Sequence, residues 1–201
     1  MLRIKSKYKI AKRLGASIFE QTQTQKFALS ETTFKKIKPR GRGGSDYSRQ
    51  LLEKQRVRFT YGLGETQLGN YVKEAYAAKD PGGTLHRLLE TRADSIIYRA
   101  DLAPTRRAAR QIVSHGHILI NGKRITTPSY RVKKGDTLTV REGSRKSPLF
   151  AGKSEEEEGR KTPSWLAVDR GALKVDVQGE PLYSPAETTL DYATVFEFYS
   201  R

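Results

Sequence analysis

The chain has 201 residues, a formal net charge of +16 and no cysteine. Its length allows a sizeable core and one or two domains, and we expect two. The lack of cysteine excludes disulfides, a cysteine-ligated zinc ion and a cysteine nucleophile. Lys and Arg total 38 against 22 acidic residues, an excess that should attract a polyanion. No apolar run is long enough to span a membrane, so we expect no membrane partner.

The charge is concentrated in two zones. Residues 1–44 carry 12 basic and 2 acidic side chains, and residues 84–146 carry 14 and 5. Residues 45–83 between them are nearly neutral, and residues 151–201 carry a net charge of −4. This zoning favours nucleic acid as the partner of the two basic zones and protein as the partner of the C-terminal part.

Residues 1–44 show weak periodicity and end in a Gly/Arg stretch, Lys38 to Gly44, that cannot hold a helix. We expect a basic N-terminal arm that is extended, the alternative being a solvated tail that becomes ordered only when it binds nucleic acid. The first 19 residues contain no acid and could serve as an organelle transit peptide. They contain few serines, however, and continue without a break into similar basic sequence, which argues against that interpretation.

Two helices are predicted next, over residues 45–61 and 65–78. Ser45 is a good N-cap residue, and glycines separate the two helices. The second helix has one apolar stripe, made by Leu68, Tyr71, Val72, Ala75 and Tyr76. This spacing is typical of a helical core rather than of a ligand site. Residues 80–83, Asp-Pro-Gly-Gly, indicate a turn and a domain boundary.

The central basic zone predicts two helices followed by a hairpin. The first helix runs over residues 84–97 with Thr84 as N-cap, and only Arg92 interrupts its apolar face. The second runs over residues 106–115, with one apolar face and one face of arginine and amide side chains. Asn121-Gly122 then predicts a tight hairpin turn, because both turn positions need positive φ.

The remaining residues predict short strands and a docked end. Leu138 and Val140 alternate on the covered face of a small sheet, and residues 173–177 alternate like a strand. The acidic run 155–158 indicates a solvated linker or the start of a helix. The apolar residues 195–199 should dock, and we expect residues 45–79 to pack against residues 165–199.

The candidate RNA-binding residues combine charge, forked donors, amides and an aromatic ring, which together suit RNA. They are Arg92, Arg106, Arg107, Arg110, Gln111, Ser114, His115, His117, Asn121, Gly122, Lys123, Arg124 and Tyr130. The alternative is an ordinary solvated helix face, against which the zoned charge argues. Metal ligation or base catalysis by the two histidines lacks a further ligand nearby, so we expect no metal, no cofactor and no catalytic residue.

Several stretches closely resemble the bacterial small-subunit ribosomal protein S-four family. They are residues 88–99, 105–123, 128–130 and 134–136, with further matches at 53–58, 61–68, 163–166 and 196–201. The resemblance covers roughly residues 45–201. The N-terminus departs from many relatives, which place four cysteines around zinc there; this chain resembles the zinc-free form.

The resemblance implies an α+β fold. A mostly helical first domain, residues 45–83 plus 151–201, would carry an inserted helix-helix-hairpin RNA-binding domain with a small sheet, residues 84–150, behind the arm 1–44. The implied function is structural and not enzymatic: a primary rRNA-binding protein that nucleates assembly of the 5′ domain in the small subunit of cytoplasmic bacterial ribosomes, an organellar ribosome being the alternative. The implied partners are small-subunit rRNA, incoming mRNA and ribosomal protein S-five. The contact with S-five would influence decoding accuracy. In some relatives the protein's own mRNA is a further partner.

Two other classes use a similar module. Pseudouridine synthases and tyrosyl-tRNA synthetases need a separate catalytic domain, for which too little chain remains. A free-standing RNA chaperone would need neither residues 45–79 nor the apolar C-terminal end. Both alternatives are therefore weaker than the ribosomal interpretation.

Overall fold

The computed structural model describes residues 4, 6–28, 30, 45–150, 160–184 and 188–200. The chain divides into two compact units, one made of Met1–Gly82 with Ser184–Arg201 and the other of Gly83–Tyr183. Among the described residues, no helix has the length and apolar character needed to cross a membrane. Each unit has its own packing.

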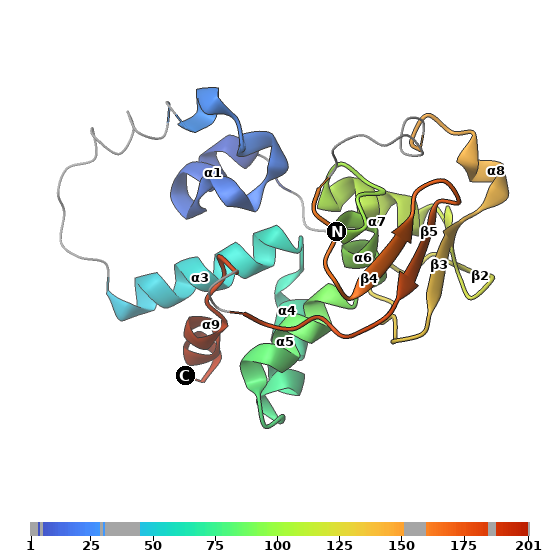
Figure 1. Ribbon diagram of the computed structural model, residues 1–201. Coiled ribbons are helices and arrows are strands. Elements are labelled where there is room, and N and C mark those ends of the chain that lie inside the picture. The colour runs from blue at the N-terminus through green and yellow to red at the C-terminus, as the bar shows by residue number, and fades with distance from the viewer. Residues whose placement is uncertain are drawn as a thin grey trace. The chain divides into compact units, whose positions relative to one another are not determined.

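The described part of the first unit is helical (Figure 1). Its elements are α1 Lys7–Leu14, the 3₁₀ turns η1 Ala16–Ile18 and η2 Glu20–Thr22, α3 Asp46–Thr60, α4 Glu65–Tyr76 and α9 Tyr192–Tyr199. Ser45 caps α3 as predicted, because its Oγ accepts a hydrogen bond from the backbone amide of Ser48 at 3.3 Å. The helices predicted over residues 45–61 and 65–78 are confirmed, with small differences at their ends.

The expectation of an extended N-terminal arm is wrong for residues 7–22. This segment folds into α1, η1 and η2, and with Phe27 it forms a small apolar cluster made by Ala11, Leu14, Ile18, Phe19 and Phe27. Arg56 of α3 fastens the end of α1, because its Nε donates to the carbonyl oxygen of Leu14 at 2.7 Å. The chain bends at Gly15, where φ is +114°, so no single helical period runs through the cluster and the pattern was missed. The Gly/Arg stretch 38–44 lies outside the described residues.

α9 packs against α3 and α4 within the first unit. Tyr192 and Val195 of α9 are fully buried. Tyr199 donates a hydrogen bond from its hydroxyl to Glu65 Oε1 at 3.1 Å. The predicted contact between residues 45–79 and the C-terminal end is therefore confirmed for α9. In α4 the predicted stripe is buried except at its last position, since Tyr76 is 59% exposed.

The second unit is α+β, which confirms the predicted fold class (Figure 1). Its elements are α5 Pro81–Glu90, which begins in the last residues of the first unit, α6 Ala93–Arg99, α7 Arg106–Ser114, β1 Ile118–Ile120, β2 Lys123–Ile125, β3 Thr137–Val140, α8 Glu142–Arg145, β4 Leu166–Asp169 and β5 Lys174–Val177. The described strands form one antiparallel sheet in the order β2-β1-β3-β5-β4. α6 and α7 pack on this sheet around a core that includes Ile96, Ile97, Ala109, Ile112, Val113, Ile118, Leu138, Val140 and Val175.

The hairpin β1–β2 forms where the sequence predicted it. Asn121 and Gly122 have φ of 49° and 79°, the left-handed conformation that this two-residue turn requires. Leu138 and Val140 of β3 are buried, as their alternation predicted. These local signals were sufficient because the turn and the strand period are short-range properties of the chain.

The single helix predicted over residues 84–97 is wrong at both ends and in its middle. α5 begins already at Pro81, a residue suited to the first helical position. The helix then breaks at Arg92, whose extended backbone forms a β-bridge with Arg131. The amide of Ala93 donates to the carbonyl oxygen of Tyr130 at 2.9 Å. Hydrogen bonds from a distant segment thus interrupt a continuous helical period.

Residues 166–177 do not join the first domain, to which the sequence analysis assigned them. β5 pairs with β3 and β4 pairs with β5, so this segment completes the sheet of the second unit. Trp165 packs against the core of that same unit. Only Ser184–Arg201 returns to the first unit. The acidic run 155–158 lies outside the described residues.

Candidate nucleic-acid interface

The candidate residues all lie in the second unit, but burial divides them into two groups. Arg92 is 1% exposed and holds both carboxylate oxygens of Asp94, with Nε–Oδ1 and Nη2–Oδ2 distances of 3.0 Å. Arg110 of α7 shares the same carboxylate, at 2.9 Å from its Nε to Oδ2. Arg92 therefore braces α6 and presents no guanidinium to a ligand, which corrects its assignment as an RNA contact.

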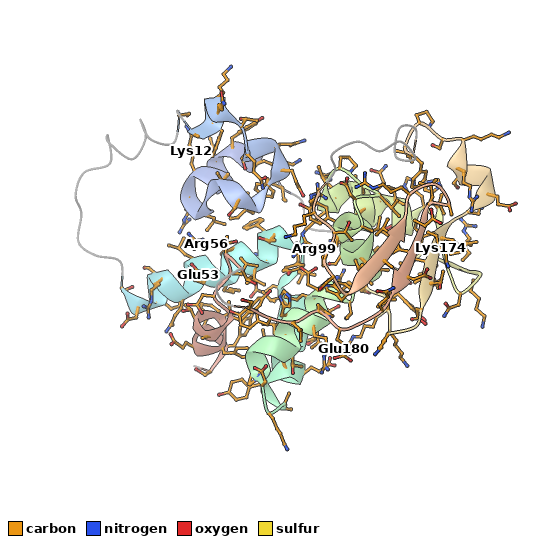
Figure 2. The ribbon with its side chains drawn as sticks, viewed as in Figure 1. Lys12, Glu53, Arg56, Arg99, Lys174 and Glu180 are labelled. Carbon is orange, nitrogen blue, oxygen red and sulfur yellow. The ribbon has the colours of Figure 1, made fainter. Side chains whose placement is uncertain are left out.

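A second buried carboxylate, Glu90, binds two further arginines. Arg99, labelled in Figure 2, donates to Glu90 from Nε and Nη2 at 2.8 and 2.7 Å. Arg106 reaches the same carboxylate at 3.2 Å, and its guanidinium lies 4.5 Å from the ring centre of Tyr98. Four arginines thus neutralise two buried carboxylates, and Arg106 and Arg110 serve mainly to join α7 to α5 and α6.

The outward face of α7 is the best candidate contact surface. Thr105 caps the helix, since its Oγ1 accepts a hydrogen bond from the backbone amide of Ala108 at 3.1 Å. Arg107, Gln111 and Ser114 follow at positions i, i+4 and i+7, and all three are exposed. The helix places a guanidinium, an amide and a hydroxyl in one row, suited to phosphate, base edges and 2′-OH groups.

Arg124 extends this face from β2 toward the end of α7. Its Nη2 donates to the carbonyl oxygen of His115 at 3.1 Å, where the helix dipole favours a cation. Gly116 has φ +72°, and a Cβ there would lie 2.2 Å from Arg124 Nε. The glycine therefore permits both the left-handed helix end and the close approach of the guanidinium.

The hairpin turn is exposed, but Asn121 is engaged within the protein. Its Nδ2 donates to Asp136 Oδ1 at 2.8 Å, and its Oδ1 accepts the amide of Thr137 at 3.0 Å. The side chain joins the hairpin turn to the turn before β3 rather than reaching outward. Gly122 and Lys123 are exposed at the tip of the hairpin.

The two histidines differ in environment. His115 is exposed, whereas His117 is half-buried with its Nδ1 2.9 Å from Ser144 Oγ. Burial lowers the pKa of His117 below 6.5, and nearby His115, Arg141 and Arg124 lower it further. His117 is thus a neutral hydrogen-bonding residue at pH 7. Within the described ranges no cluster of His, Asp or Glu could hold a metal ion.

Further exposed cations precede and follow β3 in the sequence, and they were not among the predicted contacts. They are Arg131, Lys133, Lys134, Arg141, Arg145 and Lys146. Tyr130, which was predicted, lies next to them and is 40% exposed. The signal was present in the sequence, because these bases flank both ends of the strand around Leu138. We define the basic surface as Arg107, Lys123, Arg124, Arg131, Lys133, Lys134 and Arg141.

Comparison with known families accounts for most of the described chain. The model of the ribosomal protein S4/S9 N-terminal domain matches residues 3–91, and that of the S4 domain matches residues 91–138, which hold every candidate residue. The small ribosomal subunit protein uS4 of Nocardia farcinica is 44% identical over 158 residues, covering 78% of this chain and 79% of the relative.

Other proteins named small ribosomal subunit protein uS4 extend the similarity to nearly the whole chain. That of Borrelia recurrentis is 38% identical over 200 residues, covering 98% of this chain and 96% of the relative. That of Lachnospira eligens is 40% identical over 174 residues, covering 86% and 88%. These matches confirm the resemblance seen in the sequence and the assignment to a non-enzymatic class. The chain belongs to the family of the small ribosomal subunit protein uS4.

Proposed function

We propose that this chain is a structural constituent of the small ribosomal subunit that binds rRNA through its basic surface. The observation that supports the proposal is that the cations of the second unit fall into two groups, one paired with buried carboxylates and one exposed. Glu90 and Asp94 form ion pairs with four arginines of the second unit, while the cations of the basic surface are all exposed. Cations that are exposed on the surface can reach the phosphates of an RNA.

The mechanism of binding follows from the chemistry of the exposed groups. Arg107 and Arg124 present planar forks that match two phosphate oxygens, and Lys123 adds a point charge at the hairpin tip. Gln111 and Ser114 reach base edges and 2′-OH groups, and the ring of Tyr130 offers a stacking face. The rigid α7–β1–β2 scaffold holds these groups in fixed relative positions, which favours a folded RNA site over an extended strand.

The finer parts of the proposal rest on family membership. The RNA is the 5′ domain of small-subunit rRNA, to which the chain binds early and nucleates assembly in the cytoplasm. The protein lies beside the path by which mRNA enters, contacts ribosomal protein S-five and thereby influences decoding accuracy. Its own mRNA is a further RNA that the same surface would bind.

A matched pair of double variants tests the proposal. Arg107→Gln with Lys123→Gln removes two charges from the basic surface, and Lys73→Gln with Lys79→Gln removes two exposed charges from the first unit. We expect the first pair to weaken binding to a 5′-domain rRNA fragment about tenfold or more, as loss of charge-assisted contacts predicts. Equal losses in the two pairs, measured by titration at fixed salt, would show that only total charge matters.

A further inference from the structure

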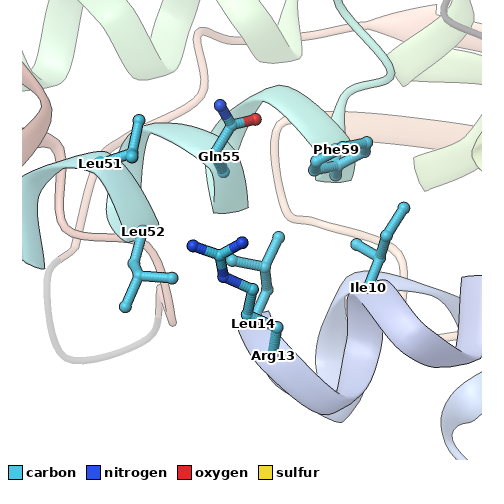
Figure 3. Close-up of a pocket in the computed structure, with 7 residues that line it drawn as sticks. All are labelled: Ile10, Arg13, Leu14, Leu51, Leu52, Gln55 and Phe59. Atoms are coloured by element: carbon cyan, nitrogen blue, oxygen red, sulfur yellow. The ribbon is translucent and has the colours of Figure 1, made fainter. Parts of the chain in front are cut away.

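A pocket opens between α1 and α3 in the first unit, outside the basic surface. Its volume is about 290 Å³, and it is lined by Ile10, Arg13, Leu14, Leu51, Leu52, Gln55 and Phe59. Figure 3 shows Arg13 rising from α1 toward α3, with Leu52 on one side and Ile10 and Phe59 on the other. The pocket lies near the lower end of the ~300–1,000 Å³ that ligand pockets occupy, so it suits a small, compact group.

The walls of the pocket are apolar and firmly supported. Leu14 is buried, while Ile10, Leu52 and Phe59 are half-buried and pack against the apolar cluster beneath. The ring of Phe59 is held edge-on by Phe19, with ring centres 6.4 Å apart. The Arg56–Leu14 hydrogen bond fixes α1 against α3 and so keeps the pocket formed. A flat apolar group entering it would meet one aromatic ring and four aliphatic side chains.

The polar groups of the pocket indicate an anionic ligand. Its lining includes one cation, Arg13, one amide, Gln55, and no acid. Gln55 accepts a hydrogen bond from Arg58 Nη1 at 3.3 Å through its oxygen, which orients its amide nitrogen as a donor. Helix α1, Lys-Tyr-Lys-Ile-Ala-Lys-Arg-Leu, contains four bases and no acid. An apolar pocket beside so basic a helix complements a ligand in which a flat, apolar group is attached to a phosphate.

We propose that this pocket receives one unstacked nucleobase of the bound rRNA. The base lies against Phe59 and the leucines, Gln55 donates to an acceptor on its edge, and Arg13 binds an adjacent phosphate. The inference rests on the proposed function, because it takes rRNA as the ligand, and adds a second contact in the first unit. An apolar side chain of a protein partner would fill the same walls, but it would leave the charge of Arg13 and α1 without a counterpart.

Filling the pocket tests the proposal in the full-length chain. Leu52→Trp places an indole in the space intended for the base, and we expect it to weaken binding to the 5′-domain rRNA fragment about tenfold, the scale of one base–aromatic contact. Arg13→Gln should lose more affinity than Lys9→Gln, which removes the same charge from the same helix but does not line the pocket. Thermal unfolding of each variant shows whether the first unit remains folded.

Ultraviolet cross-linking identifies the occupant directly. In the wild-type complex we expect a nucleotide joined to a peptide containing residues 10–14 or 51–59, and the cross-link should be absent in Leu52→Trp. An abasic substitution at that nucleotide should cost the same affinity as Leu52→Trp, without a further loss when the two are combined. If preferential rRNA binding is unchanged in Leu52→Trp and no cross-link forms in these peptides, the proposal that the pocket binds a nucleobase is wrong. The proposed function would not be affected. If the wild-type chain itself shows no preference for the fragment, the proposed function fails first.

Discussion

Asp94 and Glu90 determine which arginines of the second unit are held in ion pairs inside the protein. Both carboxylates are almost completely buried, and each is held by at least two guanidinium groups. A buried carboxylate without these partners would carry a large desolvation cost, so the pairs form a coupled set. The arginines that the sequence marked as RNA contacts therefore have two roles, and position relative to these two acids separates them.

Removing Asp94 should destabilise the chain far more than removing a surface acid. Asp94→Asn leaves Arg92 charged and 1% exposed without its counter-charge, so we expect a loss of about 3–5 kcal/mol in the free energy of unfolding. The matched control is Glu142→Gln, which alters an exposed acid and should change stability by less than about 0.5 kcal/mol. Denaturant titration followed by circular dichroism measures both, and similar values would contradict the bracing role.

Substitutions at Arg107 and Arg110 should separate effects on RNA affinity from effects on thermal stability. Arg107 is exposed, so Arg107→Ala should weaken RNA binding and leave the melting temperature unchanged. Arg110→Ala removes an ion pair to the buried Asp94 and should lower the melting temperature. The double variant combines both losses, and its RNA affinity remaining near that of the wild type would refute the role of the outward face of α7.

The buried His86 predicts a pH dependence of stability. Burial lowers the pKa of His86 below 6.5, Glu90 partly opposes this, and Arg99 and Arg106 add to the lowering. Between the two pKa values the unfolded chain binds a proton that the folded chain does not bind. The stability contributed by this group is therefore fully present above pH 6.5, and it falls as the pH drops from 6.5 through the lowered pKa. His86→Gln should flatten this fall in urea titrations at a series of pH values; an unchanged slope would assign it to other groups.

At the scale of elements, α9 is a structural part of the first unit. Val195 is fully buried in it, whereas Ala193 on the same helix is exposed. Val195→Asp should therefore unfold or strongly destabilise the first unit, because it buries an unpaired charge, while Ala193→Asp should be tolerated. Limited proteolysis of the two variants compares them directly. Equal resistance would mean that α9 is dispensable for the fold.

Local patterns were sufficient to predict some elements and not others. The apolar period of α7 and the Asn121-Gly122 turn are properties of a few consecutive residues, and both were predicted correctly. The break at Arg92 depends on hydrogen bonds from residues 130–131, which no helical period reveals. The pairing of β5 with β3 likewise joins residues far apart in the sequence, so residues 166–177 were assigned to the wrong part of the chain.

In the candidate site, the sequence was not sufficient to predict which arginines are exposed. Composition and spacing identified the basic zone, but whether an arginine is exposed depends on where the carboxylates lie. Asp94 follows two residues after Arg92, yet only the fold shows that it also reaches Arg110 on the next helix. Lys133 and Lys134 were not predicted as contacts because they lie outside the helix and hairpin that carry the recognisable pattern. Burial, rather than residue type, was the missing information.

At the scale of the whole molecule, positive charge occurs in both units with different surroundings. In the second unit a rigid sheet-backed surface carries it, and in the first unit the basic helix α1 carries it beside an apolar pocket. A chain with only generic polyanion affinity would need neither feature. On the basis of both features we propose that the chain distinguishes a folded RNA from an arbitrary one.

The most direct test compares two RNAs of equal length across a salt series: a 5′-domain small-subunit rRNA fragment and a scrambled sequence. Phosphate contacts weaken steeply with salt, whereas contacts to shape, base edges and 2′-OH groups persist. We predict that the native fragment binds tighter by about two orders of magnitude or more and keeps this preference as salt rises. Equal affinities that decline together with salt would contradict the claim and leave only a non-specific polyanion-binding protein.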